Sequence, residues 1–199
     1  MGKIKNIFDI KKYCDLIKFK FSNVLKVINK YDNTKKIESI NNNKDFNLVI
    51  SLLTAQSKSC MYEKRICSIL QGEKINSRED KGDCIDKDGK IVEIKCSTPS
   101  MYGNVLNIVQ IRLHQTVDYY ICAFIDEINY ENNFVFRLTK EQMRQECDLI
   151  GSSAHGASKK QQINKEMRIS IKLDDMDSDT TKRWLSKYRD KDLERKLFK

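Results

Sequence analysis

The stretch that decides the fold is Gly82-Asp-Cys-Ile-Asp-Lys-Asp-Gly-Lys-Ile-Val-Glu-Ile-Lys95, and its residue pattern predicts a β-hairpin. From Lys90 to Cys96 the side chains alternate between the two faces of a strand, and one face holds Ile91, Glu93 and Lys95. Asp86-Lys-Asp-Gly89 is a turn signal, because glycine readily adopts a positive φ angle. The strand and the turn together predict two antiparallel strands joined near Gly89.

The length of the turn sets which residues of the two strands lie opposite each other. If Lys87–Gly89 is a three-residue loop, Asp86 pairs with Lys90. Asp83 then faces Glu93, with Lys95 on the same face of the sheet. Two carboxylates directly opposite each other repel and destabilise a sheet. We therefore expect a cation between them, and a pair of carboxylates suits Mg²⁺.

The hairpin resembles the PD-(D/E)XK signature of restriction endonucleases and their relatives. Asp83 matches the first acidic position, Glu93 the second and Lys95 the lysine, while Gly82 stands in place of the proline. The resemblance implies a restriction-endonuclease-like α/β (α+β) core, in which helices flank a central mixed β-sheet, here with an N-terminal helical elaboration. The alternative interpretation is a solvent-exposed hairpin with ordinary surface charges.

The resemblance also implies a reaction, the hydrolysis of a DNA phosphodiester. Asp83, Glu93 and the backbone carbonyl of Ile94 would hold one or two Mg²⁺ ions, and the scissile phosphate would complete the coordination. Lys95 would position the attacking water and stabilise the anionic transition state. No nucleophilic side chain is needed in such a reaction.

A helix before the hairpin is predicted over Ser57–Gln71. Ser57 or Ser59 can cap it, Gly72 can end it, and its apolar stripe is Met61, Ile66, Ile69 and Leu70. In PD-(D/E)XK proteins this helix often carries an acidic residue that points at the metal site, and Glu63 matches that position. The alternative role for Glu63 is an intrahelical ion pair with a nearby Lys or Arg.

Composition limits the class of protein. The 199 residues fit one domain, and 37 Lys and Arg against 28 Asp and Glu give a formal net charge of +9, which favours a polyanionic partner. A compositional bias toward Asn, Lys and Ile in the source genome would give the same excess. The seven cysteines form no CxxC pair and only two histidines are present, so we expect reduced thiols, no zinc site and a cytoplasmic protein. No apolar run reaches membrane-spanning length.

Patterns elsewhere predict the remaining elements. They are a helical segment over 3–30, a polar connector over 31–45, an unclassified apolar run over 46–53, helices over 105–115 and 180–198, a helix capped by Thr139 and ending near Leu149, and strands over 119–126, 134–138 and 167–173. The single nuclease domain of residues 1–199 thus divides into an N-terminal helical segment and connector (1–45), a catalytic core (46–140), and a C-terminal helix, DNA-contacting loop, strand and helix (141–199).

Two stretches carry side chains that suit contact with DNA. In the predicted helix over 105–115 these are Asn107, Gln110, Arg112 and His114, and the Gln-x-Arg pair also resembles an extension in some members of the superfamily. In the small-residue loop over 151–160 they are Ser153, His155, Lys159 and Lys160. The alternatives are side chains that anchor the helix to neighbouring loops, and a surface loop without a ligand.

Within the superfamily, a compact chain with one nuclease core most resembles a type II restriction endonuclease. Such an enzyme cuts double-stranded DNA at a specific site and would act as a homodimer, because two-fold symmetry matches a palindrome. A nicking, mobile-element or junction-resolving nuclease would use the same core. The alternative from another class is a non-catalytic nucleic-acid-binding protein.

Overall fold

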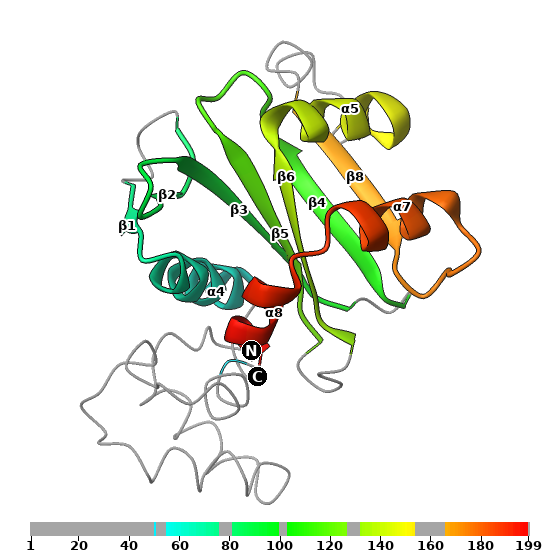
Figure 1. Ribbon diagram of the computed structural model, residues 1–199. Coiled ribbons are helices and arrows are strands. Elements are labelled where there is room, and N and C mark those ends of the chain that lie inside the picture. The colour runs from blue at the N-terminus through cyan, green and yellow to red at the C-terminus, as the bar shows by residue number, and fades with distance from the viewer. Residues whose placement is uncertain are drawn as a thin grey trace, which may run out of the picture.

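The computed structural model describes residues 50, 55–75, 81–99, 103–126, 132–153 and 166–198 (Figure 1). A five-stranded sheet in the order β1-β2-β3-β5-β6 lies at the centre of this part of the chain. Its strands are β1 (Glu73–Lys74), β2 (Cys84–Ile85), β3 (Ile91–Ser97), β5 (Tyr119–Phe124) and β6 (Phe134–Thr139). A second, three-stranded sheet in the order β4-β8-β7 consists of β4 (Val105–Ile111), β7 (Ser152–Ser153) and β8 (Met167–Lys172).

The five-stranded sheet is mixed. β3 and β5 run parallel, whereas the other neighbouring strands are antiparallel. The helices around the sheets are α4 (Ala55–Ile69), α5 (Lys140–Ile150), α7 (Asp179–Lys187) and α8 (Lys191–Phe198). This architecture confirms the predicted mixed class with a central mixed sheet and flanking helices.

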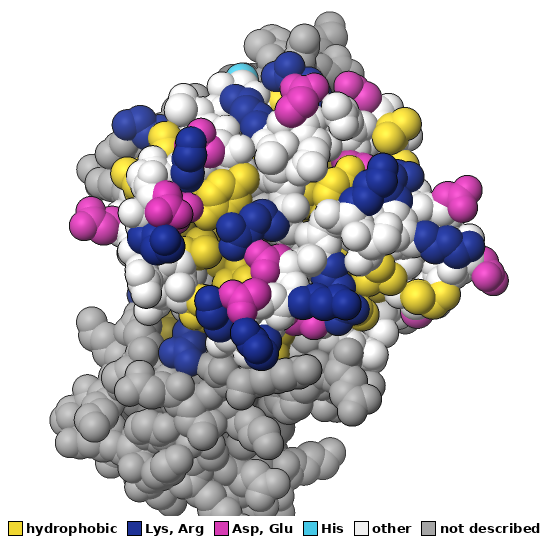
Figure 2. Space-filling model, viewed as in Figure 1, with side chains coloured by type: hydrophobic (Ala, Val, Ile, Leu, Met, Phe, Trp, Pro, Cys, Tyr) yellow, Lys and Arg dark blue, Asp and Glu magenta, His cyan; other side chains and the backbone are white. Residues whose placement is uncertain are grey.

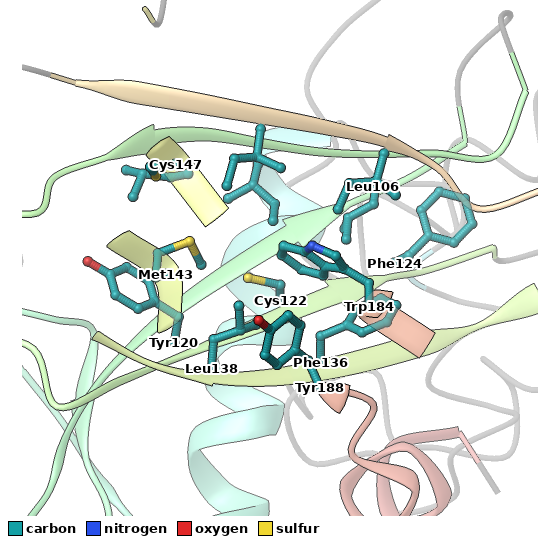
Figure 3. Packing of buried hydrophobic residues seen from close by; sticks show 14 of the residues in the cluster. Leu106, Tyr120, Cys122, Phe124, Phe136, Leu138, Met143, Cys147, Trp184 and Tyr188 are labelled. Atoms are coloured by element: carbon teal, nitrogen blue, oxygen red, sulfur yellow. The ribbon is translucent and has the colours of Figure 1, made fainter. Parts of the chain in front are cut away.

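Two apolar clusters fill the two sides of the five-stranded sheet. On one side α4 and α8 pack on the sheet through Tyr62, Ile66, Leu193 and Leu197, all of them buried. On the other side the three-stranded sheet, α5 and α7 pack on β5 and β6 (Figure 3). All six residues of β5 are buried, so the strand is apolar on both faces and the predicted central buried strand is confirmed.

Aromatic rings lie at the centre of the second cluster. The Trp184 ring centroid is 5.3 Å from that of Phe136 and 5.5 Å from that of Tyr188, and both pairs meet edge to face (Figure 3). Edge-to-face contact suits the ring quadrupole and adds to the stabilisation from burial. Thus α7, which carries Trp184, is fixed against β6.

The predicted helix over 105–115 is wrong, because this segment contains the strand β4. Leu106 and Ile108 are buried at a spacing of two residues, but the next buried residue is Ile111. The pairing of β4 with β8 shifts between Ile108 and Ile111, and Gln110 has a φ angle of +55° there. A bulge of this kind adds one residue to the strand and breaks the alternation by which a strand is recognised in sequence.

The predicted single helix over 180–198 is also wrong, because the chain breaks between α7 and α8. The Asp190 amide donates to Val135 O at 2.7 Å, and the Asp190 side chain accepts from the Leu193 amide at 2.9 Å. The first bond ties the break to β6 and the second caps α8. Trp184, Leu193 and Leu197 are buried, so this region packs on the core.

The helix predicted before the hairpin is confirmed as α4, although its start differs. It begins at Ala55, so neither Ser57 nor Ser59 caps it. At its end Gln71 adopts a φ of +53°, and the Gly72 amide donates to Cys67 O at 2.9 Å. This pattern is a Schellman motif. A Cβ atom on Gly72 would lie 2.5 Å from Ile85 O, so glycine is required where α4 passes β2.

The other predicted elements that lie in the described residues are confirmed. β6 and β8 match the strands over 134–138 and 167–173, and α5 begins after Thr139 with a capping box between Thr139 and Gln142. The segments over 3–30 and 31–45 lie outside the described residues, and so does the run over 46–53 apart from Ile50, which is buried. Among the described helices, none is long and apolar enough to cross a membrane. The described cysteines are all free thiols.

One buried carboxylate joins α5 to α7. Glu146 is 1% exposed and accepts two hydrogen bonds from Arg183, both at 2.8 Å. It also accepts from Trp184 Nε1 at 2.8 Å and from the Tyr188 hydroxyl at 2.9 Å. Burial acts to raise the pKa of Glu146, but the hydrogen bonds outweigh burial and hold the pKa below its ordinary value of 4.5. The ionised form is therefore the stabilising one.

We predict that Glu146→Gln lowers the free energy of unfolding by about 3 kcal/mol near neutral pH, since it leaves Arg183 without its partner. Because folding lowers the pKa of Glu146, the stabilisation is present above the ordinary value of 4.5 and is lost as pH falls through the lowered pKa. The difference between the two proteins should shrink over that range in urea unfolding. Glu141→Gln, an exposed position of the same helix, is the control. An equal difference at every pH would contradict this role of the charge.

Candidate active site

The hairpin forms with the predicted turn, and with the predicted pairing from the turn back to Cys84. Cys84 pairs with Val92 and Ile85 with Ile91, while the Asp86 amide donates to Lys90 O at 2.9 Å. Gly89 has a φ angle of +76°, as the end of a three-residue loop requires. The Asp86 carboxylate accepts from the amides of Asp88 and Lys90, both at 2.9 Å. The turn therefore uses Asp86 for its own geometry.

The prediction that Asp83 lies directly opposite Glu93 is wrong, because the chain departs from the ladder at Asp83. The Asp83 amide donates to Val92 O at 2.7 Å, one residue out of the register that Cys84 and Val92 define. Two residues of one strand then oppose one residue of the other, as in a β-bulge. The Asp83 carboxylate reaches along the edge of β3 and accepts from the Ile94 amide at 2.7 Å. Asp83 is thus fixed to β3 by both its backbone and its side chain.

Gly82 makes this close approach possible. A Cβ atom at Gly82 would lie 2.5 Å from Val92 O and 2.7 Å from the Val92 carbonyl carbon, distances that real Cβ atoms do not show. A proline, which has a Cβ, would meet the same obstacle. The difference from the PD-(D/E)XK signature at this position therefore has a steric reason in this chain.

Glu93 and Lys95 form a close ion pair on one face of β3. Lys95 Nζ lies 2.5 Å from Glu93 Oε1, and the Glu93 side chain is 9% exposed. Burial and the charge of Asp83 raise the pKa of Glu93, while Lys95 and the more distant Arg112 act in the opposite direction. Burial prevails, so the pKa of Glu93 lies above its ordinary value. A cation near Glu93 would favour its ionised form.

Glu63 approaches the same place from α4. Its Oε1 accepts from the hydroxyl of Ser59, one turn earlier, at 3.2 Å. Burial and the charge of Asp83 raise the pKa of Glu63, which Lys74 and Lys95 oppose. Glu63, Asp83 and Lys95 are therefore close enough in space for their charges to act on one another, although they lie far apart in sequence.

These side chains surround a pocket of about 180 Å³ at the edge of β3. It lies between α4 and β4, and its lining residues are Ser59, Glu63, Asp83, Ile94, Lys95, Cys96, Asn107, Val109 and Gln110. The structure thus brings together four of the predicted catalytic and metal-binding residues with Gln110. Glu93 is not among the lining residues but contacts the pocket through Lys95.

The carbonyl of Ile94 points toward the pocket side of β3. Ile91 O and Ser97 O accept from amides of the segment that contains β5, whereas Val92 O accepts from Asp83 on the opposite edge. Because bond direction alternates along a strand, the N–H and C=O of Ile94 point to the same edge as those of Val92. The Ile94 amide confirms this direction, since it donates to Asp83.

The donor groups fit a hard cation such as Mg²⁺. Among the described residues no group of three or more His, Cys, Asp and Glu is arranged to hold a metal ion. Mg²⁺, however, is usually bound by one or two carboxylates together with waters and substrate phosphates. Asp83, Glu93 and the Ile94 carbonyl could supply that number of ligands, and Glu63 a further one. Burial, together with the charge of Asp83, raises the pKa values of Glu63 and Glu93, and a bound cation would favour the ionised form of both.

Of the residues predicted to contact DNA, only some lie near the pocket. Gln110 lines the pocket, but Arg112 forms an ion pair with Glu166, with 2.8 Å between Nε and Oε1, as its predicted anchoring role requires. His114 is exposed beyond the end of β4. Ser153 lies in β7, and its side chain is outside the described part, as are His155, Lys159 and Lys160.

Ser59, Cys96 and Val109 are pocket residues that sequence reasoning did not assign to a site, while Asn107 was predicted only as part of a surface beside DNA. Ser59 could have been found from its spacing to Glu63, because residues four apart are neighbours on a helix. Burial raises the pKa of the Cys96 thiol well above its ordinary value, so Cys96 enters the pocket as a neutral group. Val109 carries no local signal, and the position of both Asn107 and Val109 in the pocket depends on how the two sheets meet.

No protein-family model and no curated protein matches this sequence. The assignment of the site therefore rests on the residues themselves and on their geometry.

We predict that Gly82→Ala destabilises the protein by about 1–3 kcal/mol, because the new methyl group forces Asp83 away from β3. Urea unfolding measures this difference. The matched control is Gly89→Asn, where a Cβ meets nothing within 4 Å and asparagine tolerates the φ angle of +76°. Equal, small effects of the two substitutions would show that Gly82 does not set the position of Asp83.

Proposed function

We propose that this protein is a Mg²⁺-dependent DNA endonuclease and that the pocket at the edge of β3 is its active site. The observation that carries the proposal is the convergence of Glu63, Asp83 and Lys95 on one pocket. These residues come from α4, from the bulge before β2 and from β3, so their meeting does not follow from their order in the sequence. Their arrangement supports the PD-(D/E)XK resemblance of the hairpin.

In this proposal Asp83, Glu93 and the Ile94 carbonyl hold one or two Mg²⁺ ions. When bound, Mg²⁺ lowers the pKa of a coordinated water and neutralises negative charge on the phosphate. Asp83 is suited to this role because one carboxylate oxygen is fixed by the Ile94 amide, which orients the other. Glu63 lines the same pocket from α4, where it can orient a water molecule.

Lys95 acts on the phosphate and on the attacking water. Its ammonium group lines the pocket and is held 2.5 Å from Glu93, which limits its motion. A positive charge that is already in place before the reaction stabilises the negative charge that develops on the phosphate. Lys95 can also donate a hydrogen bond to the attacking water and fix its direction.

The most specific form of the proposal is a type II restriction endonuclease that acts on double-stranded DNA as a homodimer. A nicking, mobile-element or junction-resolving nuclease would share the chemistry and differ in its products. A restriction endonuclease produces discrete fragments of a plasmid, whereas a nicking enzyme produces open circles. A non-catalytic DNA-binding protein would shift the DNA and leave it intact.

We predict that Lys95→Ala reduces the rate of plasmid cleavage at least about 100-fold and leaves DNA affinity largely unchanged, because the lysine acts mainly in the transition state. The experiment is digestion of a sequenced plasmid with Mg²⁺, with Glu93→Ala and EDTA as inactive controls. Lys90→Ala, an exposed lysine of the same hairpin, is the matched control and should cut normally. Cleavage by the Lys95 variant at the wild-type rate would overturn its assignment.

We also predict that Asp83→Asn makes the metal-free protein more stable than the wild type and removes the stabilisation of the protein by Mg²⁺. The amide oxygen can still accept from Ile94, but the repulsion with Glu63 and Glu93 is removed, so the metal-free variant should be more stable by about 0.5–1 kcal/mol. Mg²⁺ should raise the thermal midpoint of the wild-type protein and have little effect on the variant. Asp88→Asn, in the exposed turn, should behave as the wild type. An equal Mg²⁺ effect on all three proteins would exclude Asp83 as a ligand.

A further inference from the structure

The three-stranded sheet has one face in the core and one face exposed. Leu106, Ile108, Ile169 and Ile171 point inward and belong to the second apolar cluster. Since side chains alternate along a strand, the residues between them point outward. These outward residues form what we call the outer face, and its polar and apolar members include Asn107, Val109, Ser152, Arg168, Ser170 and Lys172.

The pairing of the strands places the polar residues of the outer face side by side. Asn107 pairs with Ser170, and Ser152 pairs with Arg168. The Ser170 hydroxyl donates to Asn107 Oδ1 at 3.0 Å, and Arg168 Nε donates to the same oxygen at 2.9 Å. Arg168 Nε also lies 3.2 Å from Ser170 Oγ. Asn107 and Ser170 therefore hold Arg168 through Nε and leave the outer edge of its guanidinium to face solvent.

The outer face is basic. None of the residues of β4, β7 and β8 is acidic, while Arg168 and Lys172 are both exposed. The face of the molecule turned toward the viewer in Figure 2, on which α5, α7 and α8 are visible, is different. On that face Lys and Arg are interspersed with Asp and Glu. Strands that carry positive and no negative charge, together with hydrogen-bond donors, are complementary to a phosphate backbone.

The outer face is continuous with the candidate active site. Asn107 and Val109 belong to the outer face and also line the pocket. Gln110, at the bulge of β4 with its φ angle of +55°, lines the same wall. A polyanion bound in the pocket can therefore continue across β4 onto β8 without leaving this surface.

We propose that the outer face is the track along which the phosphate backbone of duplex DNA leaves the active site. Arg168 and Lys172 contact phosphates, and Asn107 and Ser170 are positioning residues for Arg168. Four residues of a strand span roughly 14 Å, so Arg168 and Lys172 contact different phosphates. This inference rests on the proposed function for its partner, but it concerns binding and not cleavage.

The test is the salt dependence of DNA binding by the full chain in EDTA, where no cleavage occurs. Affinity for a fluorescein-labelled duplex is measured by anisotropy at a series of KCl concentrations. Arg168→Gln combined with Lys172→Gln should weaken binding and reduce the slope of log K against log salt by about 2, because each phosphate contact contributes about 0.9. Both positions are exposed, so the fold should be retained, which circular dichroism verifies.

The matched control is Arg195→Gln combined with Lys196→Gln. It removes the same charge from exposed positions of α8, which packs on the opposite side of the five-stranded sheet. Its slope should equal that of the wild type. Asn107→Ala should lower affinity a few-fold with an unchanged slope, as expected when a positioning residue is lost but the charge remains.

The outcomes separate this inference from the proposed function. If the outer-face variant and the control have the same slope, the outer face is not a contact surface, whatever the protein cuts. If the wild-type protein binds no duplex at any salt concentration, both the inference and the DNA partner are overturned. If the slope changes as expected but no DNA is cut with Mg²⁺, the surface stands and the endonuclease does not.

Discussion

The hydrogen bond from the Ile94 amide to the Asp83 carboxylate determines how the candidate site is built. β2 pairs with β3 over only two residues, so the next backbone groups along that edge of β3 have no strand beside them. A carboxylate takes the place of the missing strand at Ile94 and is itself fixed by that bond. The bulge at Asp83 and the close approach of Gly82 bring the carboxylate to this contact, and the Ile94 carbonyl points to the same edge because bond direction alternates along β3.

The pKa values of the carboxylates in the core and at the candidate site are shifted in opposite directions. Glu146 is buried and ionised, because an arginine, an indole and a phenol satisfy its oxygens, and its pKa is lowered. Glu93 is buried and Glu63 half-buried, both near the charge of Asp83, and their pKa values are raised. The first arrangement stabilises the fold. The second costs stability in the absence of a cation, which is typical of a site that binds or reacts with a ligand.

β4 connects the pocket to the basic sheet beside it. One of its faces packs in the core, and its other face carries Asn107, which lines the pocket and also holds Arg168. The bulge at Gln110 allows the strand to place residues in the core, in the pocket and on the outer face within seven positions. A residue with a positive φ angle at a candidate site is a common sign that function constrains the backbone.

Local chemistry determined the hairpin, the capped helix after Thr139 and the buried strand β5, because turn residues, caps and apolar runs act over a few positions. Asp83, Glu93 and Lys95 could therefore be named from sequence as candidate site residues. Sequence could not determine the bulges at Asp83 and Gln110, which changed the register and hid the strand β4. Sequence also could not determine the break between α7 and α8 at Asp190, because that break depends on a backbone hydrogen bond to Val135. Only the packing of α4 and β4 against the edge of β3 brought Glu63, Asn107 and Gln110 to the pocket, because contacts between distant segments leave no local pattern in the chain.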